Sequence, residues 1–110
     1  MGVKEFYDYV QLVVDNITEV GLANAFKIPS KVALKDDADG YDLKLFWKAF
    51  ASVMMERAVE AYAKGDEINP YLSSFSITNK CISSLRVKGI NRQMLIDTWI
   101  LEIRRVHGVM

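Results

Sequence analysis

The chain has 110 residues, of which 51% are hydrophobic and 25% are charged, and its formal net charge is zero. This length suits one domain with one core, and the composition excludes a disordered or low-complexity chain. A single cysteine excludes an internal disulfide, and no apolar run approaches the ~20 residues that cross a bilayer. The N-terminus lacks a secretory or myristoylation pattern. We therefore expect a soluble, cytoplasmic protein with a single helical domain over residues 1–110 and no membrane contact.

Residues 3–20 are predicted to form an amphipathic helix. Apolar residues recur at alternating steps of three and four, which places them on one side of a helix: Phe6, Val10, Val13, Ile17 and Val20. Gly21 is expected to end this helix, and residues 22–26 form either one more turn or a short second helix.

Residues 27–41 are predicted to be irregular, because Pro29 blocks a helix at their start and a cluster of aspartates before Gly40 is typical of a turn. The aspartates invite comparison with a calcium-binding EF-hand loop. With Gly40 at its sixth position, such a loop needs acidic residues where Lys35 and Phe46 stand. We therefore expect an acidic turn without calcium.

The stretch 42–64 is the strongest helix prediction. Asp42 is a good N-cap, the interior is rich in strong helix formers, and Gly65 stands where a left-handed C-cap is favoured. Polar side chains recur every four residues in one narrow row: Lys44, Lys48, Ser52, Glu56, Glu60 and Lys64. Most of the remaining helix surface is apolar, which indicates burial by several neighbours. We expect this helix at the centre of a bundle or of an oligomer.

Residues 71–88 are ambiguous. An apolar helical row coexists with a Ser-Phe-Ser-Ile-Thr alternation that suits a strand, and serine and threonine weaken a helix. We predict a helix from about residue 76 to about residue 87. Whether residues 71–80 form helix or strand is left open.

A last helix is predicted over residues 91–107, where Asn91 is the N-cap and cations stand at the C-terminal end. The predicted fold class is therefore all-α. It is a small bundle of four main helices, with a short fifth as an option, around the central helix at 42–64.

Charge is distributed unevenly along the chain. Residues 1–42 carry four lysines against eight acids, whereas residues 71–110 carry six basic residues against two acids. Opposite charges at the two ends of a sequence attract each other within a fold or between subunits, and a basic segment also suits an anionic partner.

The segment around Gly89 resembles the turn of helix-turn-helix DNA-binding domains, with Gly89 making the turn and Asn91 starting the second helix. The resemblance implies nucleic-acid binding by nearby basic and polar residues: Lys88, Arg92, Gln93, Arg104 and Arg105. The second helix is too apolar to expose one side to a groove, so a capped helical corner in the core is the competing interpretation.

Groups that carry chemistry are scarce. Glu56 and Glu60 lie one turn apart, a spacing that holds divalent metals in some bundles, but no second acidic cluster or Glu-x-x-His element accompanies them. Cys81 and His107 are the only residues of their types, and Cys81 fits an apolar core position. We expect no enzyme activity, no metal or cofactor and no small-molecule substrate.

The interior of so small a chain is limited, and it has to house two tryptophans, five phenylalanines and five methionines. Aromatic residues and methionine are enriched at protein interfaces. The interface candidates are Tyr7, Tyr9, Trp47, Met54, Met55 and Trp99. We therefore predict a non-enzymatic interaction or assembly protein that self-associates or docks on another protein, for which a small viral or phage component is one setting. Nucleic-acid binding through residues 85–105 is the alternative.

Overall fold

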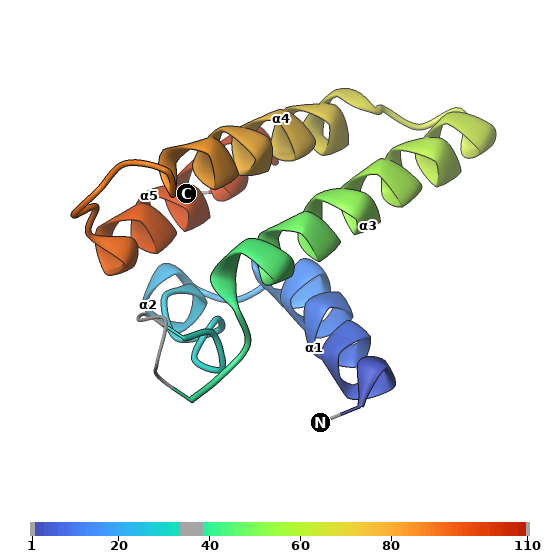
Figure 1. Cartoon of the computed structure of the whole chain (residues 1–110). Helices are drawn as coiled ribbons and strands as arrows, with labels where there is room; N and C mark the ends of the chain where they lie inside the picture. The colour runs from blue at the N-terminus through green and yellow to red at the C-terminus, as the bar shows by residue number, and fades with distance from the viewer. Residues whose placement is uncertain (1, 34–38, 110) are drawn as a thin grey trace.

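The computed structural model describes residues 2–33 and 39–109, and most of these residues are helical (Figure 1). The five helices are α1 (Val3–Asn16), α2 (Leu22–Ala25), α3 (Leu43–Lys64), α4 (Asn69–Ser84) and α5 (Arg92–Val106). No β-strand occurs in the described residues. The predicted all-α bundle, with four main helices and a short fifth, is confirmed.

The longest helix, α3, lies at the centre of the bundle. It packs against α1 on one side and against α4 on another, and α5 packs in turn against α4 (Figure 1). The link between α3 and α4 is short, so these helices run antiparallel as a hairpin. The position of α3 agrees with the prediction that a helix apolar over most of its girth needs several neighbours. None of the described helices has the length and apolar character that a bilayer crossing requires.

The ends of α3 and the start of α5 follow the caps predicted from the sequence. The Asp42 carboxylate accepts a hydrogen bond from the backbone N–H of Leu45 at 3.0 Å. The Asn91 side chain accepts one from the backbone N–H of Met94, also at 3.0 Å. These bonds satisfy N–H groups that have no partner inside a helix. Gly65 ends α3 with φ of 77°, a left-handed conformation that costs glycine little.

The structure corrects the predicted position of the third main helix. α4 begins at Asn69, several residues before the expected start, and residues 71–80 are helical throughout. Pro70 stands in the first turn of α4, where its missing N–H removes no helical hydrogen bond. Ser74 and Thr78, which weakened the helix prediction, are fully buried; Ser74 contacts His107 just after α5, and Thr78 contacts Trp99 of α5. Tertiary partners therefore override local propensity here.

The first helix is shorter than predicted. α1 ends at Asn16, and residues 17–20 continue as turns instead of helix. Leu22–Ala25 forms the short second helix that was one of the two options for this stretch.

The segment between α2 and α3 closes on itself. Tyr41 donates a backbone hydrogen bond to the carbonyl oxygen of Lys31 at 2.8 Å, and Ala33 donates one to the carbonyl oxygen of Tyr41 at 2.9 Å. Gly40 adopts φ of 128°, and a β-carbon there would stand 2.7 Å from the carbonyl oxygen of Lys31, so the close approach requires glycine. The aspartates at 36 and 37, on which the calcium comparison depended, lie outside the described residues.

Four large aromatic side chains form the centre of the core. The rings of Phe50, Trp47 and Phe46, all on α3, lie 4.8, 5.8 and 5.9 Å from the ring of Trp99 on α5, measured between centroids. Each of the four is at most 1% exposed. Tilted and edge-on aromatic contacts of this kind add to the stabilisation from burial. The cluster joins α5 to α3, so the side of α3 that carries these three rings faces the core.

Candidate functional site

The outward side of α3 carries a group of exposed apolar residues. The exposed fractions are 59% for Leu45, 37% for Met55, 63% for Val59 and 77% for Tyr62. The opposite side of the same helix is in the core, so α3 is apolar on both sides. Single exposed apolar residues are ordinary, but several on one face are typical of an interaction surface. We call the exposed side of α3, from residue 44 to residue 62, the outer face.

The apolar residues of the outer face lie along one side of the helix. Positions 45, 48, 52, 55, 59 and 62 alternate steps of three and four, as in the seam of a coiled coil. Lys48 and Ser52 take two of these positions, and the four exposed apolar residues take the others. Three of the four stand in the C-terminal half of α3, which is therefore the more apolar half.

A row of polar side chains crosses the outer face and changes sign along its length. Lys44 and Lys48 precede Ser52, and Glu56 and Glu60 follow it, each four residues from the next. All five are exposed. Among the residues that the structure describes, none of these four charges takes part in an ion pair. The charges are therefore available to a partner molecule.

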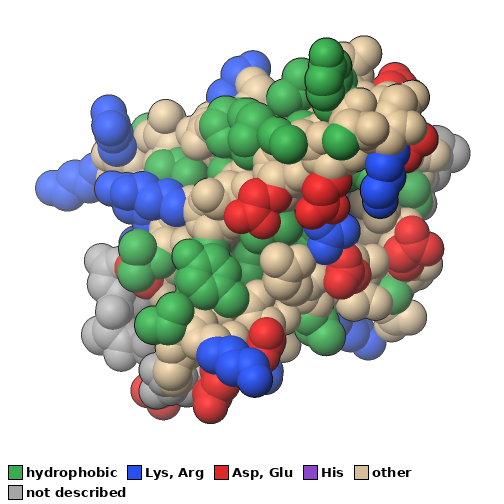
Figure 2. All heavy atoms as spheres, turned by 90° about the vertical axis from the view of Figure 1, so that its right-hand side faces the viewer, with side chains coloured by type: hydrophobic (Ala, Val, Ile, Leu, Met, Phe, Trp, Pro, Cys, Tyr) green, Lys and Arg blue, Asp and Glu red, His purple; other side chains and the backbone are tan. Residues whose placement is uncertain are grey.

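Figure 2 shows the side of the molecule toward which the C-terminal end of α3 points in Figure 1. Lysine and arginine side chains gather at one edge of this view. Several acidic side chains lie nearer the middle, with hydrophobic side chains above and below them, and other acids lie toward the bottom and right. This side of the molecule therefore carries charged and hydrophobic side chains next to one another.

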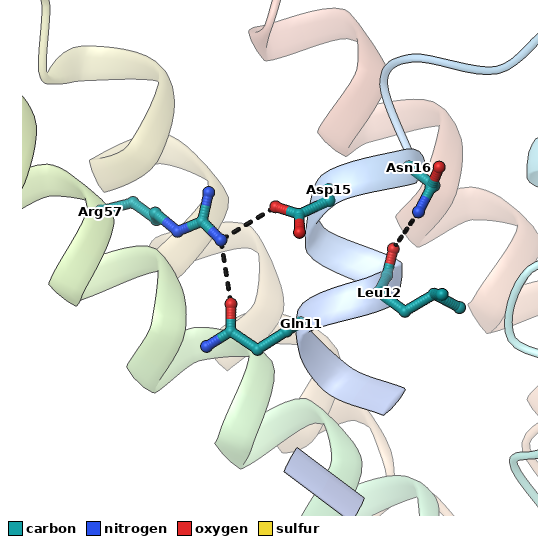
Figure 3. Close-up of polar contacts among 5 residues, drawn as sticks. All are labelled: Gln11, Leu12, Asp15, Asn16 and Arg57. Carbon is teal, nitrogen blue, oxygen red and sulfur yellow. Dashed lines mark hydrogen bonds and ion pairs between the residues drawn. The ribbon is translucent and has the colours of Figure 1, made fainter. Parts of the chain in front are cut away.

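Arg57 of α3 turns away from the outer face and contacts α1 (Figure 3). Its Nη2 atom donates a hydrogen bond to Oε1 of Gln11 at 2.9 Å and forms an ion pair with Oδ1 of Asp15 at 2.9 Å. Arg57 therefore joins α3 to α1, and it does not neutralise the neighbouring glutamates of the outer face.

Two of the six interface candidates lie on the surface. Tyr7 on α1 is 50% exposed, and Met55 belongs to the outer face. The other four candidates are corrected by the structure, because they are at most 6% exposed and lie in the core: Tyr9, Trp47, Met54 and Trp99. Large apolar side chains contribute most to stability when they are buried, and the interior of the bundle has room for these four.

Tyr9 shows how a residue chosen for an interface is used inside the fold. Its hydroxyl donates to the carbonyl oxygen of Ile28 at 3.1 Å, and its ring stacks on Tyr41 with centroids 5.3 Å apart. Burial is the largest cause that raises the pKa of Tyr9 to about 12. Tyr9 thus fixes the irregular segment after α2 to α1.

Sequence reasoning did not select Leu45, Val59 or Tyr62 as surface residues. The selection was made by residue type, which favours tryptophan and methionine, and not by position on the helix. Periodicity alone cannot tell which side of α3 is buried when both sides are apolar. The sequence does contain an indication of the exposed side. Met55, Val59 and Tyr62 lie on the same side of the helix as the polar residues Lys48 and Ser52.

Arg104, which was predicted to meet nucleic acid, is 3% exposed. Its Nη1 atom donates to the carbonyl oxygens of Ile17 at 2.9 Å and Val20 at 2.7 Å. These carbonyls follow the last turn of α1, where unsatisfied acceptors and the helix dipole favour a cation. The basic end of the sequence therefore meets the acidic end within the fold, through an arginine and backbone carbonyls.

The other residues of the nucleic-acid prediction do not form one surface. Arg92 and Gln93 stand at the start of α5, and Arg105 stands near its end, about 20 Å away at 1.5 Å per residue. Gln93 donates to Asp97 at 2.8 Å, and Arg105 forms an ion pair with Glu102 at 2.6 Å.

The outward side of α5 is not basic along its length. Met94 is 65% exposed and Leu101 is 47% exposed, between the polar groups at the two ends. Lys88 is exposed in the connection from residue 85 to residue 91, which is longer than the turn of three or four residues in a helix-turn-helix motif.

A serine and a histidine meet inside the bundle, which sequence reasoning did not anticipate. Ser74 Oγ lies 2.8 Å from His107 Nε2, and His107 lines a hollow of about 180 Å³ together with Asp15 and Arg57. Such a distance suits a nucleophile and its base. Ser74, however, has no exposed surface, so a substrate would not reach its hydroxyl. The pair instead joins the start of α4 to the end of α5.

Cys81 and the two glutamates of α3 show no arrangement suited to catalysis. Cys81 is buried, and burial, followed by the charge of Glu102, raises its pKa to about 11. The thiol is therefore protonated near neutral pH and is a poor nucleophile. Glu56 and Glu60 are exposed on the outer face. Across residues 2–33 and 39–109, no three or more His, Cys, Asp or Glu side chains are grouped to hold a metal ion.

No protein-family model, no curated protein and no solved structure matches this chain. The candidate site is therefore judged on its own geometry. Exposed apolar side chains and unneutralised charges coincide on the outer face of α3.

Proposed function

We propose that this protein is a non-enzymatic helical assembly protein, which associates with protein through the outer face of α3. The observation that carries the proposal is the exposure of Leu45, Met55, Val59 and Tyr62 on a helix whose opposite side is already buried. Fully covering one large apolar side chain is worth about 1.5–3 kcal/mol. Four such residues on one helix supply a driving force for association.

The test of this proposal is the mass of the protein in solution over a range of concentrations. Sedimentation equilibrium should show the mass of the wild-type chain rising above 12.5 kDa, the mass of one copy. Val59→Asp places a charge among the apolar residues of the outer face, and it should hold the protein at the mass of one copy. Because Val59 is 63% exposed, the variant should fold normally, which circular dichroism can verify.

Met94→Asp is the matched control, because Met94 is 65% exposed on a different helix, α5. This variant should associate as the wild type does. A wild-type chain that stays at one-copy mass at the highest attainable concentration would contradict self-association through the outer face. Equal losses in the two variants would show that association does not depend on the outer face.

Nucleic-acid binding is a second candidate, favoured by one observation. A hollow of about 220 Å³ at the end of the bundle where α3 begins has three basic side chains in its lining, those of Lys44, Arg86 and Arg92, beside Asp42 and three apolar residues. Lys88 follows two residues after Arg86 and is exposed. Clustered basic groups attract phosphates without regard to sequence.

Fluorescence anisotropy with labelled DNA and RNA tests the second candidate. Binding should weaken steeply as salt is added, because phosphate contacts release counterions. The combined substitution Arg86→Glu and Lys88→Glu should weaken it at every salt concentration. Absence of binding by the wild-type chain at low salt would remove this candidate.

A further inference from the structure

We infer that the partner of the outer face is a second copy of this chain, with the two α3 helices packed antiparallel about a two-fold axis beside Ser52. This inference rests on the proposed function and names its partner. It is carried by the order of charges on α3, by the spacing of the row that bears them and by the residue at the centre of that row.

The order of charges selects the antiparallel direction. On each copy the lysines at 44 and 48 precede Ser52, and the glutamates at 56 and 60 follow it. A two-fold axis beside Ser52 relates positions at equal distances before and after that residue. Lys48 of one copy therefore stands beside Glu56 of the second copy. Lys44 stands beside Glu60 of the second copy in the same way, and each contact occurs twice.

A parallel pairing in the same register would have the opposite effect. It would place lysine beside lysine and glutamate beside glutamate, and like charges across an interface disfavour association. The four charges have no ion-pair partner among the described residues of their own chain. Pairing between copies therefore replaces no existing contact.

The spacing of the row suits the commonest way in which two helices pack. Side chains four residues apart form ridges on a helix surface, and helices that interdigitate these ridges cross at about −50°. The charged row of the outer face is such a ridge. When two copies cross in this way their ridges run alongside each other, so the charges meet in order.

Ser52 has the size that the crossing point requires. It is exposed and small, and small residues let two helix axes approach each other closely. Leu45, Met55 and Val59 are exposed on the outer face beside the charged row. The part of this apolar surface that the crossing covers provides affinity, while the charges fix direction.

A single helix pair buries less surface than the roughly 1,200–2,000 Å² of a standard stable interface. The association is therefore expected to be weak and in rapid exchange, and its test has to work for a weak dimer. Reversing the charges at positions 48 and 56 is such a test. Each substitution alters two contacts in the dimer, because residue 48 of each copy lies beside residue 56 of the other copy.

Lys48→Glu alone places a glutamate beside Glu56 of the second copy, twice in each dimer. Glu56→Lys alone creates the corresponding pair of lysine contacts. Each single variant should weaken the dimer by about tenfold, as measured by sedimentation. The double variant Lys48→Glu with Glu56→Lys restores opposite charges in reversed order, and its dissociation constant should return to within about threefold of the wild-type value.

Cross-linking at Ser52 locates the two-fold axis independently. With diamide as oxidant, Ser52→Cys should form a disulfide-linked dimer, because the two introduced thiols meet at the crossing point. Ser76→Cys is the matched control, since Ser76 is exposed on α4 and away from the outer face. It should form no such dimer at the same protein concentration. Native Cys81 is buried and reacts in neither case.

The outcomes separate this inference from the proposed function. A wild-type chain that never dimerises overturns this inference and leaves docking on a different protein as the role of the outer face. A dimer that Val59→Asp dissociates, but that the double charge variant does not restore and Ser52→Cys does not trap, overturns the two-fold geometry alone and leaves the outer face as the binding surface.

Discussion

At the scale of single residues, Arg104 joins segments that are far apart in the sequence. Its hydrogen bonds to Ile17 and Val20 join residues 87 and 84 positions apart and satisfy carbonyls at the end of α1. Arg104→Met keeps much of the apolar stem but removes the donors, so one buried and one partly buried carbonyl oxygen lose their partner. We expect the free energy of unfolding to fall by about 3 kcal/mol, measured by urea denaturation.

Arg105 provides the comparison for that measurement. It is the neighbour of Arg104, is exposed, and has its ion pair with Glu102 at the surface. Exposed ion pairs contribute about 0–1 kcal/mol, so Arg105→Met should change stability little. Similar losses in the free energy of unfolding at both positions would show that the hydrogen bonds of Arg104 do not stabilise the fold more than a surface ion pair does.

At the scale of helices, the contact between α4 and α5 depends on a buried hydrogen bond. Trp99 Nε1 donates to Thr78 Oγ1 at 3.0 Å, and both residues are fully buried. Thr78→Val has nearly the same shape but leaves the indole N–H without an acceptor. We expect a loss of about 1–3 kcal/mol in the free energy of unfolding. Thr98→Val, at an exposed position of α5, should stay within about 0.5 kcal/mol of wild type.

Helix α4 also shows where local sequence is a poor guide. The caps at Asp42, Gly65 and Asn91 were predicted correctly, because each depends on a few neighbouring backbone groups. The start of α4 was not, because Ser74 and Thr78 find their partners in or just after α5, later in the chain. Propensity treats such residues as exposed or turn-forming, and it contains no information about those partners.

At the scale of the whole molecule, His107 makes stability depend on pH. Burial lowers the pKa of His107 below its usual 6.5, because the charged imidazolium is disfavoured inside the bundle. The unfolded chain then binds a proton more readily than the folded one. The contribution of the neutral histidine is complete above pH 6.5 and is lost as the pH falls from 6.5 toward the lower pKa of the folded state.

This dependence is measurable by denaturation at about pH 7.5 and about pH 5.5, with His107→Gln as the reference. Glutamine retains a polar group near Ser74 but has no proton to gain. The wild-type chain should lose more stability than the variant across this interval, since the variant lacks only the titration of His107. An identical pH dependence in the two proteins would rule out the role of His107.

The candidate site was only partly accessible from the sequence. The polar row from Lys44 to Glu60 and the apolar character of both sides of α3 could be read directly. The sequence does not show that Trp47 is buried and Val59 is exposed, because this depends on which side of α3 meets Trp99. The role of Arg104 was equally hidden, since its partners are backbone carbonyls that every residue possesses.

The hydrogen bonds of Arg104 also bear on the order in which the chain assembles. During synthesis α1 leaves the ribosome early, but the side chain that satisfies its last carbonyls is made more than eighty residues later. Until then those carbonyls depend on water, and the final turn of α1 frays. Contacts between such distant segments form slowly, because a long loop has to close first. Docking of α5 onto the end of α1 is therefore expected to be the late step that completes the native fold.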